Sequence, residues 1–142
     1  MNSVLRFETH SDEETRNVGR QLAALLPQHG VVLLIGNLGA GKTTLAKGIV
    51  EGLGAAPADE VSSPTFTLIH EYGDGRVYHI DLYRLEEARE AATLGLDEIF
   101  ERDAVVLLEW GERFPRLLPA ARIEIRLRAH DDEREIEVRS LA

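Results

Sequence analysis

A short glycine-rich segment is the feature that most constrains what this chain can fold into. Residues 36–43, GNLGAGKT, match the pattern G-x-x-x-x-G-K-[ST] at every fixed position. The preceding run VVLLI (31–35) is wholly apolar, which is typical of a strand buried on both faces of a parallel sheet. Residues 42–53 have helical character, and Gly54 follows as a helix terminator. This strand–loop–helix order is the context in which the pattern predicts a phosphate-binding loop.

Each fixed residue type in the loop has a chemical reason. Glycines let the backbone curl so that successive N–H groups point at one phosphate. A helix beginning near Lys42 adds the positive end of its dipole. The Lys42 ammonium can reach the β- and γ-phosphates, and the Thr43 hydroxyl can coordinate Mg²⁺. The loop therefore predicts a nucleoside triphosphate site.

Such a site also needs an acid at the end of a second strand, to hold the magnesium shell. Glu109 ends the apolar run 104–108, and Asp81 ends the segment 77–80. Open α/β sheets bind ligands at the carboxyl ends of their strands, where both acids would lie. A solvated strand-end carboxylate is the ordinary alternative for each, but the loop favours function. The residues leave open which acid holds the metal and which polarises the attacking water.

Four further positions allow both a functional and a structural interpretation. Residues 62–65 (SSPT) suit a switch-like turn that senses the γ-phosphate, although a plain proline turn is favoured. Arg84 is suited to stabilising the charge of a transferred phosphoryl group, but an ion pair on the surface is the favoured interpretation. Trp110 is suited to gating access to the site, but packing in the core is the favoured interpretation. His79 precedes Asp81 by two residues on one side of a strand, and we favour a structural role for it.

The base that the site takes is expected to be adenine. The second half of the chain has no N-K-x-D motif of the guanine-specific type. In so small a protein the base is expected against residues 7–15, with Thr9 and Thr15 as the contacts to test.

The pattern of strands and helices predicts one domain over residues 1–142. We expect a three-layer α/β domain of the P-loop NTPase type. Its sheet should be mixed and mainly parallel, with antiparallel hairpins added. Ser11 and Glu14 have capping-box spacing at the start of a first helix, which Pro27 and Gly30 end. Its expected apolar face is formed by Val18, Leu22, Leu25 and Leu26. A two-piece helix is expected over 86–100, broken near Gly95. The other expected strands are 4–9, 65–72, 77–81, 122–128 and 134–140, the last four forming two hairpins.

The composition indicates which cellular compartment and which kinds of partner to expect for this protein. The chain has no cysteine, which excludes disulfides and thiolate metal sites. Its 16 basic and 25 acidic residues give a net charge of −9, which argues against unaided binding of nucleic acid. No apolar run approaches the ~20 residues of a membrane helix, and the start lacks a signal core. We therefore expect a cytoplasmic protein that approaches RNA only through protein partners and does not bind membranes.

Four motifs, in this order, closely resemble the bacterial TsaE (YjeE) family. They are residues 36–44 around the loop, 63–68 (SPTFTL), 79–85 (HIDLYRL) and 107–110 (LLEW). The loop alone is common to many NTPases, whereas the other three together are much more specific. The likeness in length and motif order extends over essentially the whole chain.

The resemblance implies a small P-loop ATPase needed for threonylcarbamoyladenosine modification of tRNA. Such a protein binds ATP with Mg²⁺, hydrolyses it slowly alone, and acts with a TsaB–TsaD pair in which TsaD modifies adenosine 37 of tRNAs. Hydrolysis would reset that complex between turnovers. The family's magnesium ligands fall on Thr43 and Glu109, and its other essential acid on Asp81. Its phosphate contacts fall on Gly39, Ala40, Gly41, Lys42, Thr43 and Thr44.

Two other functions stay open on the residues alone. A small-molecule P-loop kinase would need an acceptor pocket and a lid, for which only about twenty residues between 82 and 102 are left. A nucleotide-binding regulator would bind ATP tightly and release no phosphate.

Overall fold

The computed structural model describes residues 4–37, 39–64 and 68–141. The elements are β1 (Val4–Thr9), α1 (Asp12–Ala23), β2 (Gly30–Ile35), α2 (Lys42–Gly52), β3 (Ile69–Tyr72), β4 (Val77–Asp81), α3 (Ala88–Thr93), α4 (Leu96–Phe100), β5 (Val105–Glu109), β6 (Arg122–His130) and β7 (Glu133–Leu141). Short 3₁₀ turns cover Ala58–Glu60, Gly111–Arg113 and Pro115–Leu117. None of the helices in these ranges is long and apolar enough to cross a membrane.

The described strands form a single mixed sheet in the order β1-β7-β6-β2-β5-β4-β3. The four central strands β6, β2, β5 and β4 are mutually parallel, and β7 and β3 run against their neighbours. β1 pairs antiparallel to β7 and so has the direction of the central strands. The mainly parallel sheet with antiparallel hairpins is therefore confirmed.

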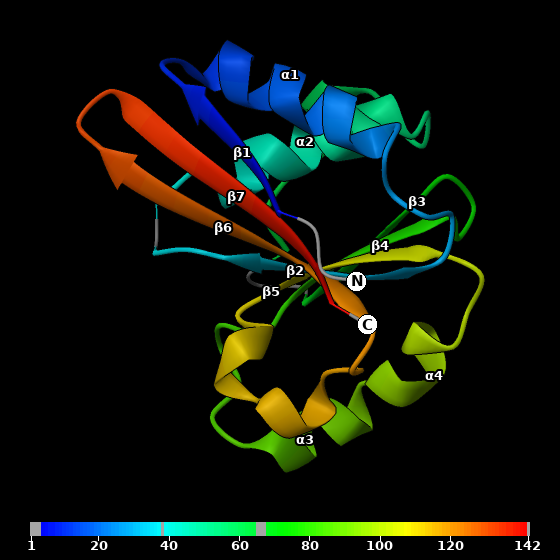
Figure 1. Ribbon diagram of the computed structural model, residues 1–142. Helices are drawn as coiled ribbons and strands as arrows, with labels where there is room; N and C mark the ends of the chain where they lie inside the picture. Colours follow the sequence, from blue (N-terminus) through cyan, green and yellow to red (C-terminus); the bar gives the residue numbers. More distant parts are fainter. Residues whose placement is uncertain (1–3, 38, 65–67, 142) are drawn as a thin grey trace.

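Helices lie on both sides of this sheet, which makes three layers (Figure 1). α1 and α2 cover one face, where Leu22 and Ile49 pack on apolar side chains of β2, β5, β6 and β7. α3, α4 and the two later 3₁₀ turns cover the other face, where Leu96 and Phe114 pack on β2, β4 and β5. The predicted α/β three-layer class is thus confirmed.

The first helix begins as predicted but ends earlier. The Ser11 side chain accepts a hydrogen bond from the Glu14 backbone N–H at 3.1 Å, as in a capping box. The Glu14 carboxylate, however, accepts from the His10 N–H rather than from that of Ser11. α1 ends at Ala23, and Leu25, expected on its buried face, is 64% exposed. Placing the helix end at Pro27 was therefore wrong: the chain leaves the helix after Ala23, and of the two leucines that follow, Leu26 still packs on the core while Leu25 faces solvent.

The other local predictions fit with modest changes. The helix over 86–100 is broken as expected, and Gly95 has the left-handed φ of +73° that ends α3 and begins α4. The strand expected over 65–72 is β3 (Ile69–Tyr72), with residues 65–67 outside the described part. The second hairpin is longer than expected, because β6 extends to His130 and β7 begins at Glu133.

Close contact between α1 and α2 fixes the helix that carries the glycine-rich loop. A Cβ built on Gly48 would lie 2.0 Å from the Arg16 carbonyl oxygen, and one on Gly19 would lie 2.5 Å from that of Leu45. Only glycine permits this approach, because real Cβ atoms do not come so near to backbone. The backbones of the two helices therefore hold the start of α2 in one position above the sheet.

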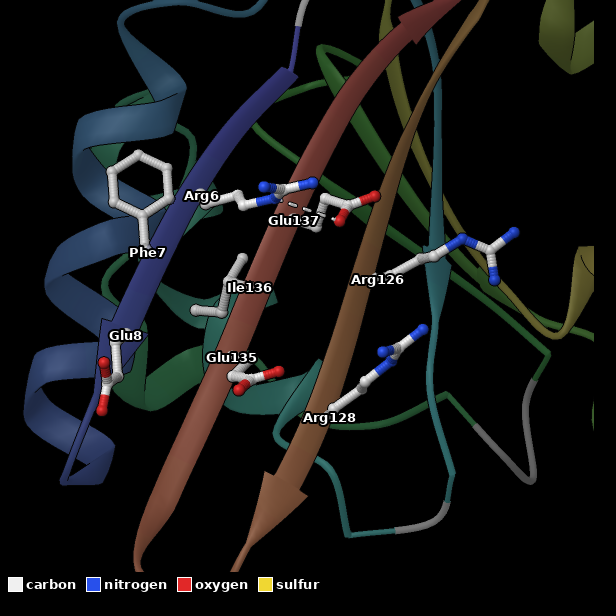
Figure 2. A pocket seen from close by; sticks show the side chains of 8 residues that line it. All are labelled: Arg6, Phe7, Glu8, Arg126, Arg128, Glu135, Ile136 and Glu137. Atoms are coloured by element: carbon white, nitrogen blue, oxygen red, sulfur yellow. Dashed lines mark hydrogen bonds and ion pairs between the residues drawn. The ribbon is translucent and has the colours of Figure 1, made fainter.

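The helices of the second layer leave one part of the sheet bare. Side chains of β1, β7 and β6 that point away from α1 line a hollow of about 390 Å³, shown in Figure 2. We call this surface the open sheet face; its charged residues are Arg6, Glu8, Arg126, Arg128, Glu135 and Glu137. A charged face beside a buried one is normal for antiparallel strands.

Candidate functional site

The glycine-rich loop has the backbone conformation that its sequence demands. Gly39 and Gly41 have φ of +79° and +103°, which other L-residues rarely adopt. A Cβ on Gly36 would lie 2.9 Å from the Leu127 carbonyl oxygen, so the loop leaves β2 against the backbone of β6. The loop delivers the chain directly into the N-terminus of α2, where free backbone N–H groups favour an anion.

A cavity of about 220 Å³ opens in front of this loop. Its lining brings together segments from across the chain: Asp12, Gly39, Gly41, Lys42, Thr43, Thr44, Ser63, Asp81, Tyr83, Glu109, Trp110 and Arg134. Most of the predicted site residues are therefore at one place.

Lys42 stands out in this cavity because its ammonium group is buried and makes no hydrogen bond to any described residue. The residue is 5% exposed, and Nζ has no hydrogen-bond partner among the described residues. Nζ lies 3.7 Å from the centre of the Trp110 ring, in a cation–π contact. Burial lowers the pKa of Lys42, and the nearby carboxylates of Glu109, Glu112 and Asp81 oppose this shift. A cation in this position is available to an anionic ligand.

The two predicted acids lie side by side at the carboxyl ends of neighbouring strands. Asp81 of β4 pairs in register with Glu109 of β5, and they are 2% and 3% exposed. Asp81 Oδ1 accepts a hydrogen bond from the Tyr83 N–H at 2.8 Å. Glu109 Oε2 lies 2.5 Å from Nε2 of His79, which is completely buried. Two adjacent carboxylates supply the oxygen donors that suit a divalent cation.

A third acid, Glu112, lies near Lys42 in the 3₁₀ turn after β5. Its Oε1 atom is buried and has no hydrogen-bond partner within the described ranges. Burial raises the pKa of Glu112, while its own backbone N–H, Lys42, Arg126 and Arg113 pull the pKa down. The sequence analysis missed this residue, because its approach to Lys42 depends on the turn at Trp110, which has a left-handed φ of +66°.

Several sequence interpretations need adjustment. Trp110, for which composition favours core packing, packs partly on the core but also lines the cavity, where its ring contacts Lys42 and Tyr83. Arg84 is exposed and is not among the residues that line the cavity. Ser63 lines the cavity, whereas Thr65 of the same motif lies outside the described residues.

The two predicted base contacts, Thr9 and Thr15, are not among the residues that line the cavity. The Thr9 and Thr15 hydroxyls are 2.7 Å apart and each residue is 1% exposed, so they bond to one another. Asp12, inside the expected 7–15 segment, lines the cavity instead. Arg134 of β7 joins it there, with its Nε 3.9 Å from a Cβ built on Gly41. No local signal marks Arg134, because only the long β6–β7 hairpin brings it to the loop.

Ala40 differs from the other loop residues. Its side chain is 3% exposed and belongs to the core on the α2 side of the sheet. Any contact of Ala40 with a phosphate would therefore come from its backbone N–H.

Comparison with known proteins agrees with the motif order. The family model described as "Threonylcarbamoyl adenosine biosynthesis protein TsaE" matches residues 9–136. The tRNA threonylcarbamoyladenosine biosynthesis protein TsaE of Bacillus subtilis is 47% identical over 135 residues, covering 93% of this chain and 83% of the relative. That of Treponema pallidum is 39% identical over 136 residues, covering 94% and 99%.

A solved structure is similar over the whole fold. The crystal structure of Bacillus subtilis YdiB superimposes with a TM-score of 0.79 at 39% sequence identity. The superposition covers 100% of this chain and 88% of that one. The fold of this chain has thus already been seen by crystallography.

Proposed function

The chain belongs to the TsaE family of tRNA threonylcarbamoyladenosine biosynthesis, and from this premise we propose that it is a Mg²⁺-dependent ATPase that serves the modification. One observation carries the proposal: the buried, unpartnered Nζ of Lys42 beside the glycine-rich loop. A buried ammonium that makes no hydrogen bond is costly, and it is tolerated where a ligand supplies acceptor atoms that carry negative charge. The triphosphate of ATP is such a ligand.

The residues around Lys42 fit ATP with Mg²⁺. The backbone N–H groups from Gly39 to Thr44 would hold the phosphates, and Lys42 would leave the Trp110 ring to bind the β- and γ-phosphates. Thr43 and Glu109 would hold Mg²⁺, which when bound neutralises charge on the phosphates. Asp12 and Arg134 also line the cavity, and we propose that the adenosine lies against them.

Hydrolysis needs a polarised water as well as a held phosphate. Asp81 lies next to Glu109 and has one oxygen occupied by the Tyr83 N–H. We propose that Asp81 orients the attacking water while Glu109 serves the metal. Both carboxylates are buried, so each acts where water is scarce and electrostatic effects are strong.

We further propose that the chain works with a TsaB–TsaD pair and reaches tRNA only through it. The net charge of −9 is unsuited to holding RNA directly. The cations that line the cavity, within the described residues, are Lys42 and Arg134, and Nη1 of Arg134 already donates to two carbonyls of its own hairpin. Slow turnover alone is therefore expected, because a further cation supplied by a partner can raise such rates ~10³–10⁵-fold.

The test is phosphate release from Mg²⁺-ATP by the chain alone and with an equimolar TsaB–TsaD pair. A low rate alone that rises strongly with the pair is expected, and the Lys42→Ala variant should abolish both. Tight ATP binding without release under either condition would instead indicate a regulator. Transfer of the γ-phosphate to a small metabolite would indicate a kinase.

A further inference from the structure

His79 is the one completely buried histidine described, and it contacts a residue of the proposed site. It lies on β4 two residues before Asp81, so both side chains are on the face of the sheet that α2 covers. Its Nε2 lies 2.5 Å from Glu109 Oε2. Its other ring nitrogen, Nδ1, is buried and has no hydrogen-bond partner in the described part of the chain.

Core packing alone does not account for an imidazole at this position. The neighbouring core positions on this face of the strands, Val77, Val105 and Leu107, are aliphatic. An aliphatic side chain would fill the space without leaving a buried nitrogen unpaired, which costs free energy. What the imidazole adds is a hydrogen bond to Glu109, in which Nε2–H donates and the carboxylate accepts.

We propose that His79 is a positioning residue for Glu109, an inference that rests on the function proposed above. By holding Oε2, it fixes the rotamer of the carboxylate and leaves Oε1 to face the cavity and the Mg²⁺ of bound ATP. Hydrogen-bond partners of metal ligands commonly change metal affinity 10- to 100-fold. His79 touches neither nucleotide nor metal in this arrangement.

The neighbouring strand supplies a matched control. His70 of β3 pairs in register with His79 and so lies on the same face of the sheet. Its Nδ1 lies 3.3 Å from the Tyr72 hydroxyl instead of contacting a carboxylate. Replacing His70, which is half-buried on the edge strand, removes a histidine from the paired position without touching Glu109.

The test compares His79→Gln, His79→Asn and His79→Leu with His70→Gln. The Gln amide nitrogen can take the place of Nε2, whereas that of Asn corresponds to Nδ1 and falls short of Glu109. The readout is Mn²⁺ binding to the protein–ATP complex, followed by electron paramagnetic resonance, with ATP affinity without metal measured beside it. We expect His79→Leu and His79→Asn to weaken Mn²⁺ binding about 10- to 100-fold, with metal-free ATP affinity unchanged. His79→Gln should recover most of the loss, and His70→Gln should bind Mn²⁺ as wild type does.

A second readout needs neither metal nor nucleotide. In ¹⁵N-labelled protein, the His79 Nε2 proton should be protected from exchange and shifted downfield, and Glu109→Gln should move it upfield because a neutral acceptor is weaker. An unchanged proton signal would overturn the proposal, as would equal Mn²⁺ affinity in wild type and His79→Leu, or equal losses in His79→Gln and His79→Asn. Wild type that fails to bind ATP with Mn²⁺ would instead overturn the proposed function, and with it this role of His79.

Discussion

The charged side chains of the sheet are buried in one half and mostly exposed to solvent in the other. The parallel strands β5 and β4 are buried at every position, and their last residues, Glu109 and Asp81, carry buried carboxylates into the cavity. The antiparallel strands β1, β7 and β6 are bare on one side, where most of their charged side chains are exposed. Arg6 and Arg139 both contact Glu137, at 3.4 and 2.6 Å.

This difference in burial identifies the functional half of the sheet better than the volume of its cavity does. The hollow on the open sheet face, about 390 Å³, is larger than the cavity at the glycine-rich loop, about 220 Å³ (Figure 2). Its charged side chains, however, are mostly exposed to solvent, where an ion pair such as Arg6–Glu137 contributes little. At the loop, the Lys42 Nζ and Glu112 Oε1 atoms are buried without a hydrogen-bond partner among the described residues. Buried polar atoms that lack hydrogen bonds therefore mark the site, and exposed charged side chains mark a solvated surface.

The largest expected effect is at Lys42. Replacing it with Ala removes a charge-assisted contact worth ~1.5–3 kcal/mol, so Mg²⁺-ATP should bind about 10- to 150-fold more weakly. Hydrolysis should fall to background. The fold should be about as stable as before, because the change breaks no hydrogen bond of Nζ within the described residues. Isothermal titration calorimetry and thermal unfolding measure the two quantities.

Lys47 is the matched control for this change, since it is the only other lysine and lies on the same helix. Lys47→Ala should bind ATP as wild type does. If Lys42→Ala binds ATP normally, or unfolds at a much lower temperature, then the lysine is structural. The contrast drawn between the two halves of the sheet would then be wrong.

The next effect separates the two strand-end acids. Glu109→Gln and Asp81→Asn should each lower phosphate release about 100-fold, the usual scale for a residue that acts on the proton or metal of the reaction. Only Glu109→Gln should also raise the Mg²⁺ concentration needed for half-maximal rate, because Glu109 is assigned to the metal. A magnesium titration of both variants measures this. The opposite pattern would exchange the two roles.

A smaller effect, in stability, concerns Glu112. Burial raises its pKa above the ordinary value of 4.5, so the folded protein favours the protonated carboxyl. The stability that this gives is fully present below pH 4.5 and is lost as the pH rises through the raised pKa. Relative to wild type, Glu112→Gln should therefore gain thermal stability from pH 4 to pH 7.5. A difference in Tm that is constant with pH would mean that the carboxyl titrates normally.

Local sequence predicts the strand–loop–helix unit well, because each of its steps depends on neighbouring residues. The loop glycines, the buried run before them and the acids at two strand ends are all visible in the chain. What the sequence could not predict depends on distant contacts. Arg134 reaches the cavity only through the long hairpin, and Glu112 only through the turn at Trp110. The pairing of Thr9 with Thr15 likewise depends on how β1 meets α1.

The smallest effect is expected on the open sheet face. Arg139 and Arg6 lower the pKa of Glu137, mainly through the hydrogen bond from Arg139. The stability that this gives is present at neutral pH and lost as the pH falls through the lowered pKa. Glu137→Gln should lower Tm by about 2 °C or less at pH 7, as surface ion pairs generally do, and less still in 1 M salt. Phosphate release should not change. A larger fall that salt does not reduce would mean that this face is held by its ion pairs, and the contrast between the two halves of the sheet would then be one of degree.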